Sequence, residues 1–498
     1  MHDATKKRWA WGRIHGAIAV PKGLLAAALV LAGWAAACEG CKATKPVKTQ
    51  DITPATPTAR LVLLSDLGAA LEPCGCVADQ RGGLARLGAF TEGNPFPVAV
   101  AAAGPTFFDC VDLDTSRAAQ DTEKAQAVAG VLARTPFFFA PSRSDFAGGV
   151  ERLRELVNTS RGKAVSGALT VAGQAFGAPG VVDMGPTKVA FLGYSGRSRD
   201  ASVADVAGVQ FGAEGAADGA ALAKNVETLR AAGARFVVLL ASGSRGEAQR
   251  IVDRAPGIDL LLVGTDAVRG EVIRDDVPLG RIEHTVVLQP ASRLQSVVVV
   301  ELVDRGGVFR EGGLAEEGSR FSVRTEPMGA ARAKSQGIGA ILSAYDERLD
   351  GQNRVRYAGR VPVSVAAGEA HYLGVDVCTG CHTEPASVWR GTRHADAYAT
   401  LTTRHKAFDL DCVGCHVTGY DKPGGSTVTH AKNLENVQCE SCHGPGSKHV
   451  EGGGLKSAIV RKPDVAVCTG CHHEPHVDKS WRVEDAWPKI LGHGHGRP

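Results

Sequence analysis

Four Cys-x-x-Cys-His motifs lie in the last quarter of this 498-residue chain. The two cysteines of such a motif can form thioether bonds with one haem, and the adjacent histidine can bind the haem iron as its proximal ligand. Zinc sites also use Cys-x-x-Cys pairs, but zinc does not require a histidine directly after the second cysteine. The sequence therefore predicts four covalently attached c-type haems. The predicted haem-binding residues are Cys378, Cys381, His382, Cys412, Cys415, His416, Cys439, Cys442, His443, Cys468, Cys471 and His472.

The histidines are strongly segregated along the chain. Of 16 histidines, 13 lie between His371 and His495. Four haem irons have eight axial positions, and the motif histidines fill four of them as proximal ligands. Two histidines on one iron hold it low-spin, which suits electron transfer, whereas a five-coordinate iron is open to a small ligand. The remaining candidates for distal ligands are His371, His394, His405, His430, His449, His473, His476, His493 and His495.

The runs YLGVDVCTGCHTEPASVWRGTRHADAYATL, DCVGCHVTGY, NVQCESCHGPGSKHV and WPKILGHGHG resemble the cytochrome c-554 family of tetrahaem electron carriers. The resemblance covers about a quarter of the chain. It implies a domain of helices and loops, at 371–498, in which the haems form most of the core. It also implies that His394 and His449 are distal iron ligands, and that His493 supplies a third, with His495 as the alternative.

The second motif differs from the others in what the resemblance implies. In well-known members of the family the iron on the second motif is five-coordinate. The resemblance therefore implies that the iron on His416 has an open sixth position. His405 and His430 are the residues that can change this here. The sequence leaves both possibilities open.

The N-terminus has the pattern of an export signal. Basic residues precede an apolar run of fourteen residues, LLAAALVLAGWAAA, which is too short to span a membrane at about 1.5 Å per residue. The run ends before Cys38 in a sequence that resembles a bacterial lipobox. We therefore expect residues 1–37 to be a lipoprotein signal peptide, Cys38 to be lipidated and 38–59 to be a linker. A plain signal peptide, with Cys38 incidental, is the alternative.

Short apolar runs alternate with helical patterns between residues 60 and 330, which predicts a layered α/β domain. The order of the segments LLSDLGAALEP, GGLARL, AAAGPTFF, SRSDFAGG, VVLLASGSRG and GIDLLLVGTDA resembles the metallophosphoesterase half of the 5′-nucleotidase family. The resemblance implies a metallophosphoesterase-like sandwich. The runs predicted to be strands are 60–64, 98–102, 188–192, 235–240 and 259–263.

The metal-binding positions of that family are almost all replaced. Asp66 remains at the first ligand position, and between Cys38 and Glu369 the chain has one histidine, His284. A two-metal phosphoesterase needs histidines and carboxylates to hold its metals. We therefore expect a pseudoenzyme, with a 5′-nucleotidase-like phosphoesterase as a lesser alternative. The residues at the other family positions are Gly68, Pro105, Arg143, Ser144, Ser242, Thr265 and Ala267.

The five other cysteines are Cys38, Cys41, Cys74, Cys76 and Cys110. Export implies an oxidising compartment, which favours a disulfide between Cys110 and either Cys74 or Cys76. A thiolate metal site or a redox-active pair is the alternative. Cys41 is free in one interpretation and paired with the remaining thiol in the other.

The function expected from these features is electron transfer between unidentified redox proteins, in the periplasm or at the outer membrane. The protein would be lipid-anchored in the bacterial envelope, and residues 331–370, a helix and a connector, would join its two domains. The net charge of +3 gives no reason to expect nucleic acid as a partner. The alternative is a haem enzyme acting on a small nitrogen compound at a five-coordinate iron. No set of acid and base residues for such an enzyme is identifiable, so we expect an electron carrier rather than an enzyme.

Overall fold

In the computed structural model, the part of the chain that the structure describes belongs to one compact unit, which begins at Pro54. The expected signal peptide, Cys38, Cys41, Cys76, Ala267, His493 and His495 lie outside the described residues. In the part of the chain that is described, no helix is both long and apolar enough to cross a membrane. The structure describes residues 55–74, 80–197, 205–213, 215–265, 277–473, 476–477 and 481–492.

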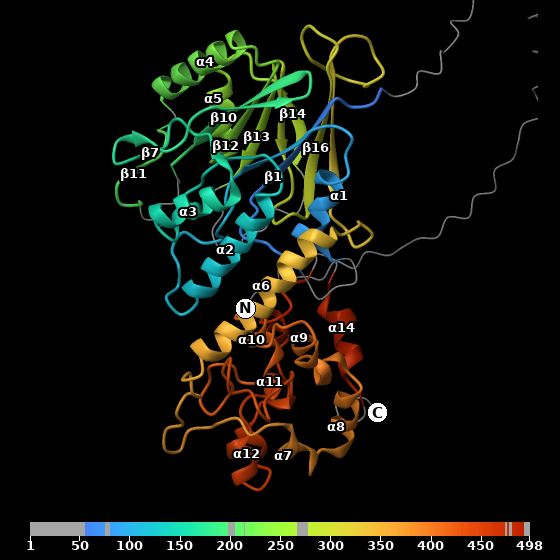
Figure 1. The fold of residues 1–498 in the computed structure, drawn as a ribbon. Coiled ribbons are helices and arrows are strands. Elements are labelled where there is room, and N and C mark those ends of the chain that lie inside the picture. Colours follow the sequence, from blue (N-terminus) through green and yellow to red (C-terminus); the bar gives the residue numbers. More distant parts are fainter. Residues whose placement is uncertain are drawn as a thin grey trace, which may run out of the picture. The chain divides into compact units, whose positions relative to one another are not determined.

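Two large sheets form the centre of the α/β region (Figure 1). The seven-stranded sheet runs in the order β17 (Arg310–Glu311), β18 (Arg320–Pro327), β16 (Ser296–Val303), β1 (Ala59–Ser65), β4 (Val98–Ala103), β5 (Phe137–Ala140) and β6 (Lys163–Ala164). The six-stranded sheet runs in the order β14 (Val277–Ile282), β15 (Thr285–Gln289), β13 (Leu260–Gly264), β12 (Phe236–Ser242), β10 (Thr187–Ser195) and β9 (Gly180–Met184). Smaller sheets join β11 (Val209–Gln210), β7 (Thr170–Val171) and β8 (Gln174–Ala175), and β2 (Pro73–Cys74) and β3 (Arg81–Gly82).

The two large sheets pack face to face because alternate residues of each strand point to opposite sides. Leu61 and Leu63 of β1 belong to the core between the sheets, whereas Val62 and Leu64 face the helices on the outer side. Phe138 of β5 stacks on Phe191 of β10 across the interface, with ring centroids 4.2 Å apart. Both faces of each sheet are therefore buried, as the continuous apolar strands predict.

Helices cover the outer face of each sheet, which completes four layers. The core on the outer face of the first sheet contains apolar residues of α2 (Ala118–Leu132), α3 (Val150–Ser160) and α6 (Gln336–Arg356). The outer face of the second sheet packs against α4 (Ala216–Ala231) and α5 (Arg245–Val252). The layered α/β prediction is confirmed. Shorter helical segments of this region are η1 (Leu84–Leu87), α1 (Gly88–Thr91) and η2 (Ser144–Phe146).

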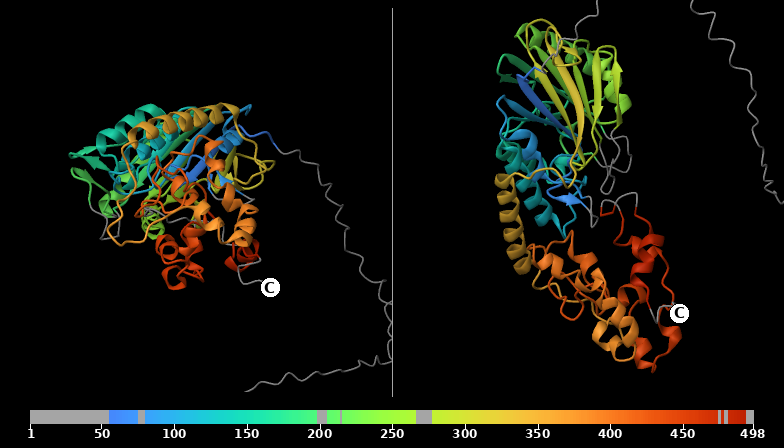
Figure 2. Two further views of the ribbon diagram at one scale, coloured as in Figure 1. Left: turned by 90° about the horizontal axis from the view of Figure 1, so that it is seen from below. Right: turned by 90° about the vertical axis from the view of Figure 1, so that its right-hand side faces the viewer.

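The C-terminal part is built from short helices and loops, as predicted (Figure 2). Its largest cluster of buried apolar residues contains only Val413, Val417, Val428 and Ala431. Such a small core cannot account for an ordered domain by itself. The helices are α7 (Val375–Thr379), α8 (Thr383–Arg390), η3 (Arg393–Asp396), α9 (Ala399–Thr402), α10 (Val413–His416), α11 (Cys439–His443), α12 (Ser447–Glu451), η4 (Lys456–Ala458), α13 (Ala466–Thr469) and α14 (Val483–Ile490).

Candidate haem-binding site

Each Cys-x-x-Cys-His motif contains a turn of helix. The motifs begin within α7, immediately before α10, at the start of α11 and within α13. Residues three apart on a helix lie on the same side, so one helical turn presents both cysteines in one direction. The histidine closes the turn in two motifs, where the amides of His382 and His472 donate to the carbonyls of Cys378 and Cys468 at 3.0 and 2.8 Å. This is the local geometry that attachment to a single haem edge requires.

The four motifs approach one another in two pairs. The side chain of Cys378 lies close to that of Cys439, so the first motif lies beside the third. The side chain of Cys415 lies close to that of Cys471, so the second motif lies beside the fourth. Haems attached at these cysteines would therefore be close neighbours within each pair.

Glu440 joins the first and third motifs, a role that the sequence analysis missed. Its carboxylate is 2% exposed and accepts from the amide of Gly374 at 2.8 Å and from the amide of Gly446 at 2.7 Å. Gly374 immediately precedes α7, whereas Glu440 lies between the cysteines of the third motif. A glutamate inside a haem-attachment motif was the available signal, because a charged side chain is seldom fully buried without partners.

Two pairs of histidines face each other across a gap of similar size. The ring centroids of His382 and His449 are 6.1 Å apart, and those of His394 and His472 are 6.2 Å apart. An imidazole nitrogen binds a first-row transition metal at about 2.0–2.1 Å, and the ring centre lies about 1 Å farther out, so two imidazoles on opposite sides of one iron have centroids about 6 Å apart. Both gaps therefore fit a single haem iron.

Backbone carbonyls select the tautomer of three histidines. A carbonyl can only accept, so Nδ1 is the protonated nitrogen where it contacts one, and Nε2 is left to bind metal. Nδ1 of His416 donates to Ala397 O and Nδ1 of His443 to Val460 O, both at 2.6 Å, and Nδ1 of His449 donates to Leu455 O at 3.0 Å. Iron requires a neutral imidazole, and burial lowers the pKa of both His394 and His472.

Large apolar side chains near the motifs are exposed to a degree that is unusual for folded protein. Each of them lies within eight residues of a motif or a paired histidine, whereas the apolar strands of the α/β region are almost fully buried. An apolar macrocycle bound at the motifs would cover such side chains. The donor set, the two gaps and this surface together fit c-type haem. The exposed residues are Val377 (44%), Val450 (46%), Leu455 (52%), Val460 (51%), Val465 (50%) and Val467 (40%).

The other candidate ligands occupy different surroundings. Nδ1 of His430 lies 3.1 Å from the hydroxyl of Thr429, and His473 packs edge-on against His476 with centroids 5.2 Å apart. Trp481, which the sequence analysis did not consider, stacks on His472 at 5.0 Å. Among the described residues, no ring pair involves His371, His405 or His416. The predicted third distal ligand, His493 or His495, lies outside them.

The residues at the positions where the sequence resemblance places metal ligands lie at one edge of the two sheets, where the parallel strands β1, β4, β12 and β13 end. Asp66 Oδ1 accepts from the amide of Thr265 at 2.7 Å, and the Ser242 hydroxyl accepts from the amide of Gly104 at 2.8 Å and donates to Ala140 O at 2.6 Å. A Cβ at Gly264 would lie 2.1 Å from the Gly104 nitrogen, so the strand ends pack directly against each other. Within the described ranges, no group of three or more His, Cys, Asp or Glu residues could hold a metal ion.

Arg143 and Ser144 lie at the same edge but serve the local structure. Arg143 donates to Val111 O at 2.6 Å, and the amides of Thr106 and Phe107 donate to the neighbouring Asp145 at 2.9 and 2.8 Å. Cys110 immediately precedes Val111 and is buried, and the backbone of Cys74 belongs to β2. The pairing of Cys110 with Cys74 or Cys76 stays a prediction.

Comparison with known proteins identifies the haem-binding segment. Residues 377–444 match the family "Cytochrome c554 and c-prime". This part of the chain is similar to c-type cytochromes of that family, and the family implies covalently bound haem. Cytochrome c-554 of Nitrosomonas europaea is 38% identical over 96 residues, which cover 16% of this chain and 41% of that protein. The predicted resemblance is confirmed, although the match spans less than half of the relative.

The α/β region is similar to solved phosphoesterase-like structures. A sulfate thiohydrolase, SoxB, of Thermus thermophilus is 19% identical and covers 59% of this chain and 61% of its own, with a TM-score of 0.45. A 5′-nucleotidase precursor, also from Thermus thermophilus, is 18% identical and covers 59% of each chain, again with a TM-score of 0.45. These values describe a distant likeness in fold and carry no statement about activity.

Proposed function

We propose that this protein is a multihaem c-type cytochrome that transfers electrons, with four haems attached at its four motifs. The observation that carries the proposal is the geometry of the two histidine pairs, His382 with His449 and His394 with His472. Bound haem supplies one-electron redox chemistry at its iron. The protein's part is to hold two neutral imidazoles at a fixed separation, so the surroundings of the metal need to change little when its charge changes.

The pairing of the motifs supports electron exchange within the domain. Contacts between Cys378 and Cys439, and between Cys415 and Cys471, bring the attachment edges of neighbouring haems together. Glu440 fixes the approach of the first pair through backbone amides on both sides of it. Electrons can then pass between haems without a mobile carrier. External donors and acceptors would be other redox proteins, as expected from the sequence.

A spectroscopic redox titration of the purified full-length protein tests this proposal. A pyridine haemochrome assay should give four haems per chain, and electron paramagnetic resonance of the oxidised protein should show low-spin ferric signals from the histidine pairs. The haems should be reduced and reoxidised reversibly. Fewer haems than motifs, or no low-spin signal, would contradict the proposal.

A haem enzyme is the second candidate, and the surroundings of His416 favour it. The Nδ1 bond from His416 to Ala397 O leaves Nε2 for iron, and His416 belongs to neither of the two histidine pairs, His382 with His449 and His394 with His472. A small molecule could occupy the open side of an iron held in this way. A high-spin ferric signal that shifts on addition of nitrite, nitric oxide or hydroxylamine would support this candidate. Spectra in which every haem is low-spin would exclude it.

We also propose that the protein is exported and anchored by lipid at Cys38, with the domains on the outer side of the membrane. The support is the N-terminal sequence, with its apolar run directly before Cys38. Covalent haem attachment is consistent with an exported protein. Mass spectrometry of the mature N-terminus in a bacterial host tests this: an unmodified terminus, or one that retains residues 1–37, would contradict it.

A further inference from the structure

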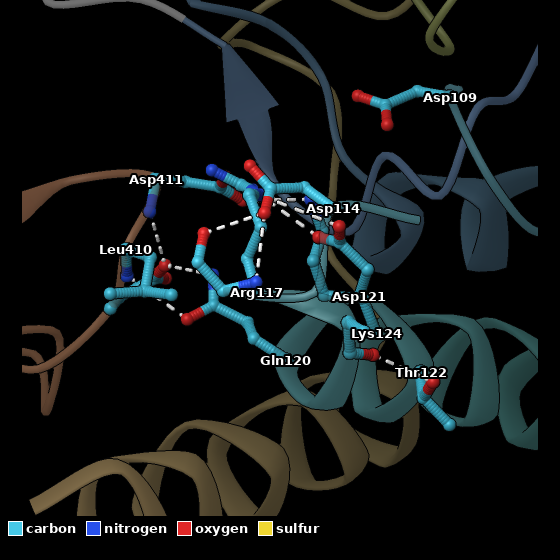
Figure 3. Close-up of polar contacts among 12 residues, drawn as sticks. Asp109, Asp114, Arg117, Gln120, Asp121, Thr122, Lys124, Leu410 and Asp411 are labelled. Atoms are coloured by element: carbon cyan, nitrogen blue, oxygen red, sulfur yellow. Dashed lines mark hydrogen bonds and ion pairs between the residues drawn. The ribbon is translucent and has the colours of Figure 1, made fainter. Parts of the chain in front are cut away.

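Arg117, the N-cap residue of α2, and two polar residues on one face of the helix contact the segment that leads into the second haem motif (Figure 3). Arg117, Gln120 and Lys124 are spaced i, i+3 and i+7, which places them on the same side of a helix. The opposing residues are consecutive, Asp409, Leu410 and Asp411, and they immediately precede Cys412. This face of α2 therefore contacts the haem domain directly before a haem-attachment cysteine.

Gln120 uses both ends of its amide in this contact. Its Nε2 donates to Asp409 Oδ1 at 2.7 Å, and its Oε1 accepts from the backbone amide of Leu410 at 2.9 Å. The same oxygen accepts from Asn353 of α6 at 2.9 Å, and Asn353 also donates to Phe408 O at 3.0 Å. Gln120 and Asn353 are both 0% exposed. A buried polar network whose members are satisfied by one another fixes a single arrangement of the segments that it joins.

Asp411 adds a charged contact beside this network. Lys124 Nζ lies 2.7 Å from Asp411 Oδ2, and Arg117 bonds to Asp411 Oδ1. Arg117 is also held by Asp121 on α2, at 3.2 Å. The charged side chains are mostly withdrawn from solvent, with 16% of Lys124 and 19% of Arg117 exposed. Breaking one of these ion pairs would leave a poorly solvated charge, so the pairs favour one arrangement of the two segments.

Backbone hydrogen bonds connect this contact to the proximal histidine of the second motif. The carbonyl of Asp409 accepts from the amides of Cys412 and Val413, at 3.0 and 2.9 Å, and so caps the start of α10. That helix ends at His416, the proximal histidine of the second motif. A shift of Asp409 would therefore move the helix that carries both the attachment cysteines and the iron ligand.

Polar contacts with the α/β region are concentrated on this one segment of the haem domain. Besides Asp409, Leu410 and Asp411, they include Lys406, which pairs with Glu72 at 3.0 Å and with Asp346 of α6 at 2.9 Å. These contacts hold the segment that leads into the second haem motif.

We propose that α2 is a positioning element for the second haem, through Gln120, Lys124 and Arg117. The inference rests on the proposed cytochrome function and extends it to the α/β domain. In this role the domain needs no metal of its own. Its hydrogen bonds and ion pairs hold residues 406–411 in place, and with them α10 and His416. The charges of α2 lie close enough to the attachment cysteine to influence the potential of that haem.

Amide hydrogen exchange of the full-length haem protein tests the positioning role. Gln120→Leu keeps the approximate size of the side chain but removes its hydrogen bonds. We expect peptides covering 406–417 to exchange at least tenfold faster, whereas peptides covering the first and third motifs stay at the wild-type rate. Peptides from β1 and β4 report whether the sandwich remains folded. Wild-type exchange over 406–417, or an equal increase at every motif, would overturn the inference.

A redox titration of Lys124→Glu provides the second measurement, with Lys124→Arg as the conservative rescue and Lys224→Glu, on exposed α4, as a control with the same charge change. Replacing a nearby cation by an anion favours the ferric state. The expected result is a fall in the midpoint of one haem, by about tenfold in the ratio of reduced to oxidised haem, or about 59 mV for one electron. Lys124→Arg and Lys224→Glu should match wild type.

The outcomes separate this inference from the proposed function. A wild-type protein with fewer than four haems contradicts the proposed function. A wild-type protein with four haems, combined with Lys124→Glu and Gln120→Leu variants that match it in both potential and exchange, contradicts the positioning role alone. A shift of all haems by the same amount also contradicts it, because Lys124 contacts Asp411, which immediately precedes one motif.

Discussion

The ring centroids of His394 and His472 lie 6.2 Å apart, although His394 follows the first motif and His472 belongs to the fourth. A haem iron held between these two rings would take its distal ligand from the segment after the first motif. His382 and His449 would join the first motif to the segment after the third in the same way. In both cases the haem would cross-link distant parts of the chain and so help to order a domain with so small an apolar core.

His394→Ala should leave one more iron without its distal imidazole. The expected result is a gain of one high-spin ferric haem per protein relative to wild type, because a five-coordinate iron loses the strong ligand field of two imidazoles. Electron paramagnetic resonance of the oxidised variant, integrated per haem, measures the gain. Cyanide should bind to the new open position.

His430→Ala is the matched control for that substitution. His430 belongs to the same domain, but its Nδ1 lies near the hydroxyl of Thr429 and its ring faces no other described histidine. Its spectrum should equal that of wild type. An unchanged low-spin spectrum in His394→Ala, or the same gain in both variants, would refute the assignment of His394.

Sequence patterns predict the positions of strands and helices, whereas contacts between residues far apart in the sequence are seen only in the structure. The five apolar runs predicted as strands all overlap strands and begin within one residue of them, although two observed strands end two or three residues later, because such runs can be buried on both faces of a sheet. The helix predicted within residues 331–370 is observed as α6, which continues to Arg356. Its last turns bring Asn353 to Gln120, and no periodicity in either helix shows that these two residues meet.

The same distinction applies to the haem site. The motifs mark the attachment cysteines and proximal histidines because these residues are adjacent in sequence. The family resemblance identifies His394 and His449 as distal ligands, but which iron each one reaches depends on how the loops fold. Glu440 and Trp481 were missed because their roles come from backbone amides and a ring brought close only in the folded domain.

Phe139→Ala should destabilise the α/β region without changing the haems. Phe139 is 0% exposed, stacks on Phe137 with centroids 5.4 Å apart and meets Phe107 edge-on at 5.5 Å. Removing a buried aromatic ring leaves a cavity and costs about 3–5 kcal/mol. Urea unfolding followed by far-ultraviolet circular dichroism measures the loss, and the haem absorption spectrum before unfolding should equal that of wild type. Val181→Ala, at an exposed position, should change stability by less than 1 kcal/mol, about the usual effect of a surface substitution.

Cys110 should be resistant to alkylation until a reductant is added. The prediction follows from the oxidising compartment that export implies, where a disulfide with Cys74 or Cys76 would persist. The protein is unfolded in denaturant with iodoacetamide, first without and then with reductant, and peptides are identified by mass spectrometry. Unfolding removes protection by burial, so only a covalent bond keeps Cys110 unlabelled. Complete labelling without reductant would show that Cys110 is a thiol.

Asp346→Asn should change the pH dependence of stability in a defined direction. Burial raises the pKa of Asp346 to about 6, against the opposing effect of Lys406, whose Nζ donates to Asp346 Oδ1 at 2.9 Å. The folded protein therefore binds a proton more tightly than the unfolded chain, in which the pKa is about 3.9. The resulting stabilisation is fully present below about pH 4 and is lost as the pH rises through 6.

Asparagine at position 346 keeps an oxygen for Lys406 but cannot titrate. The stability of wild type relative to Asp346→Asn should thus fall by about 1–3 kcal/mol between pH 4 and pH 7. Urea unfolding at several pH values measures this difference, and Asp205→Asn, at an exposed ion pair with Arg197, provides the control. Parallel curves for wild type and Asp346→Asn would show that burial does not raise the pKa of this carboxyl group.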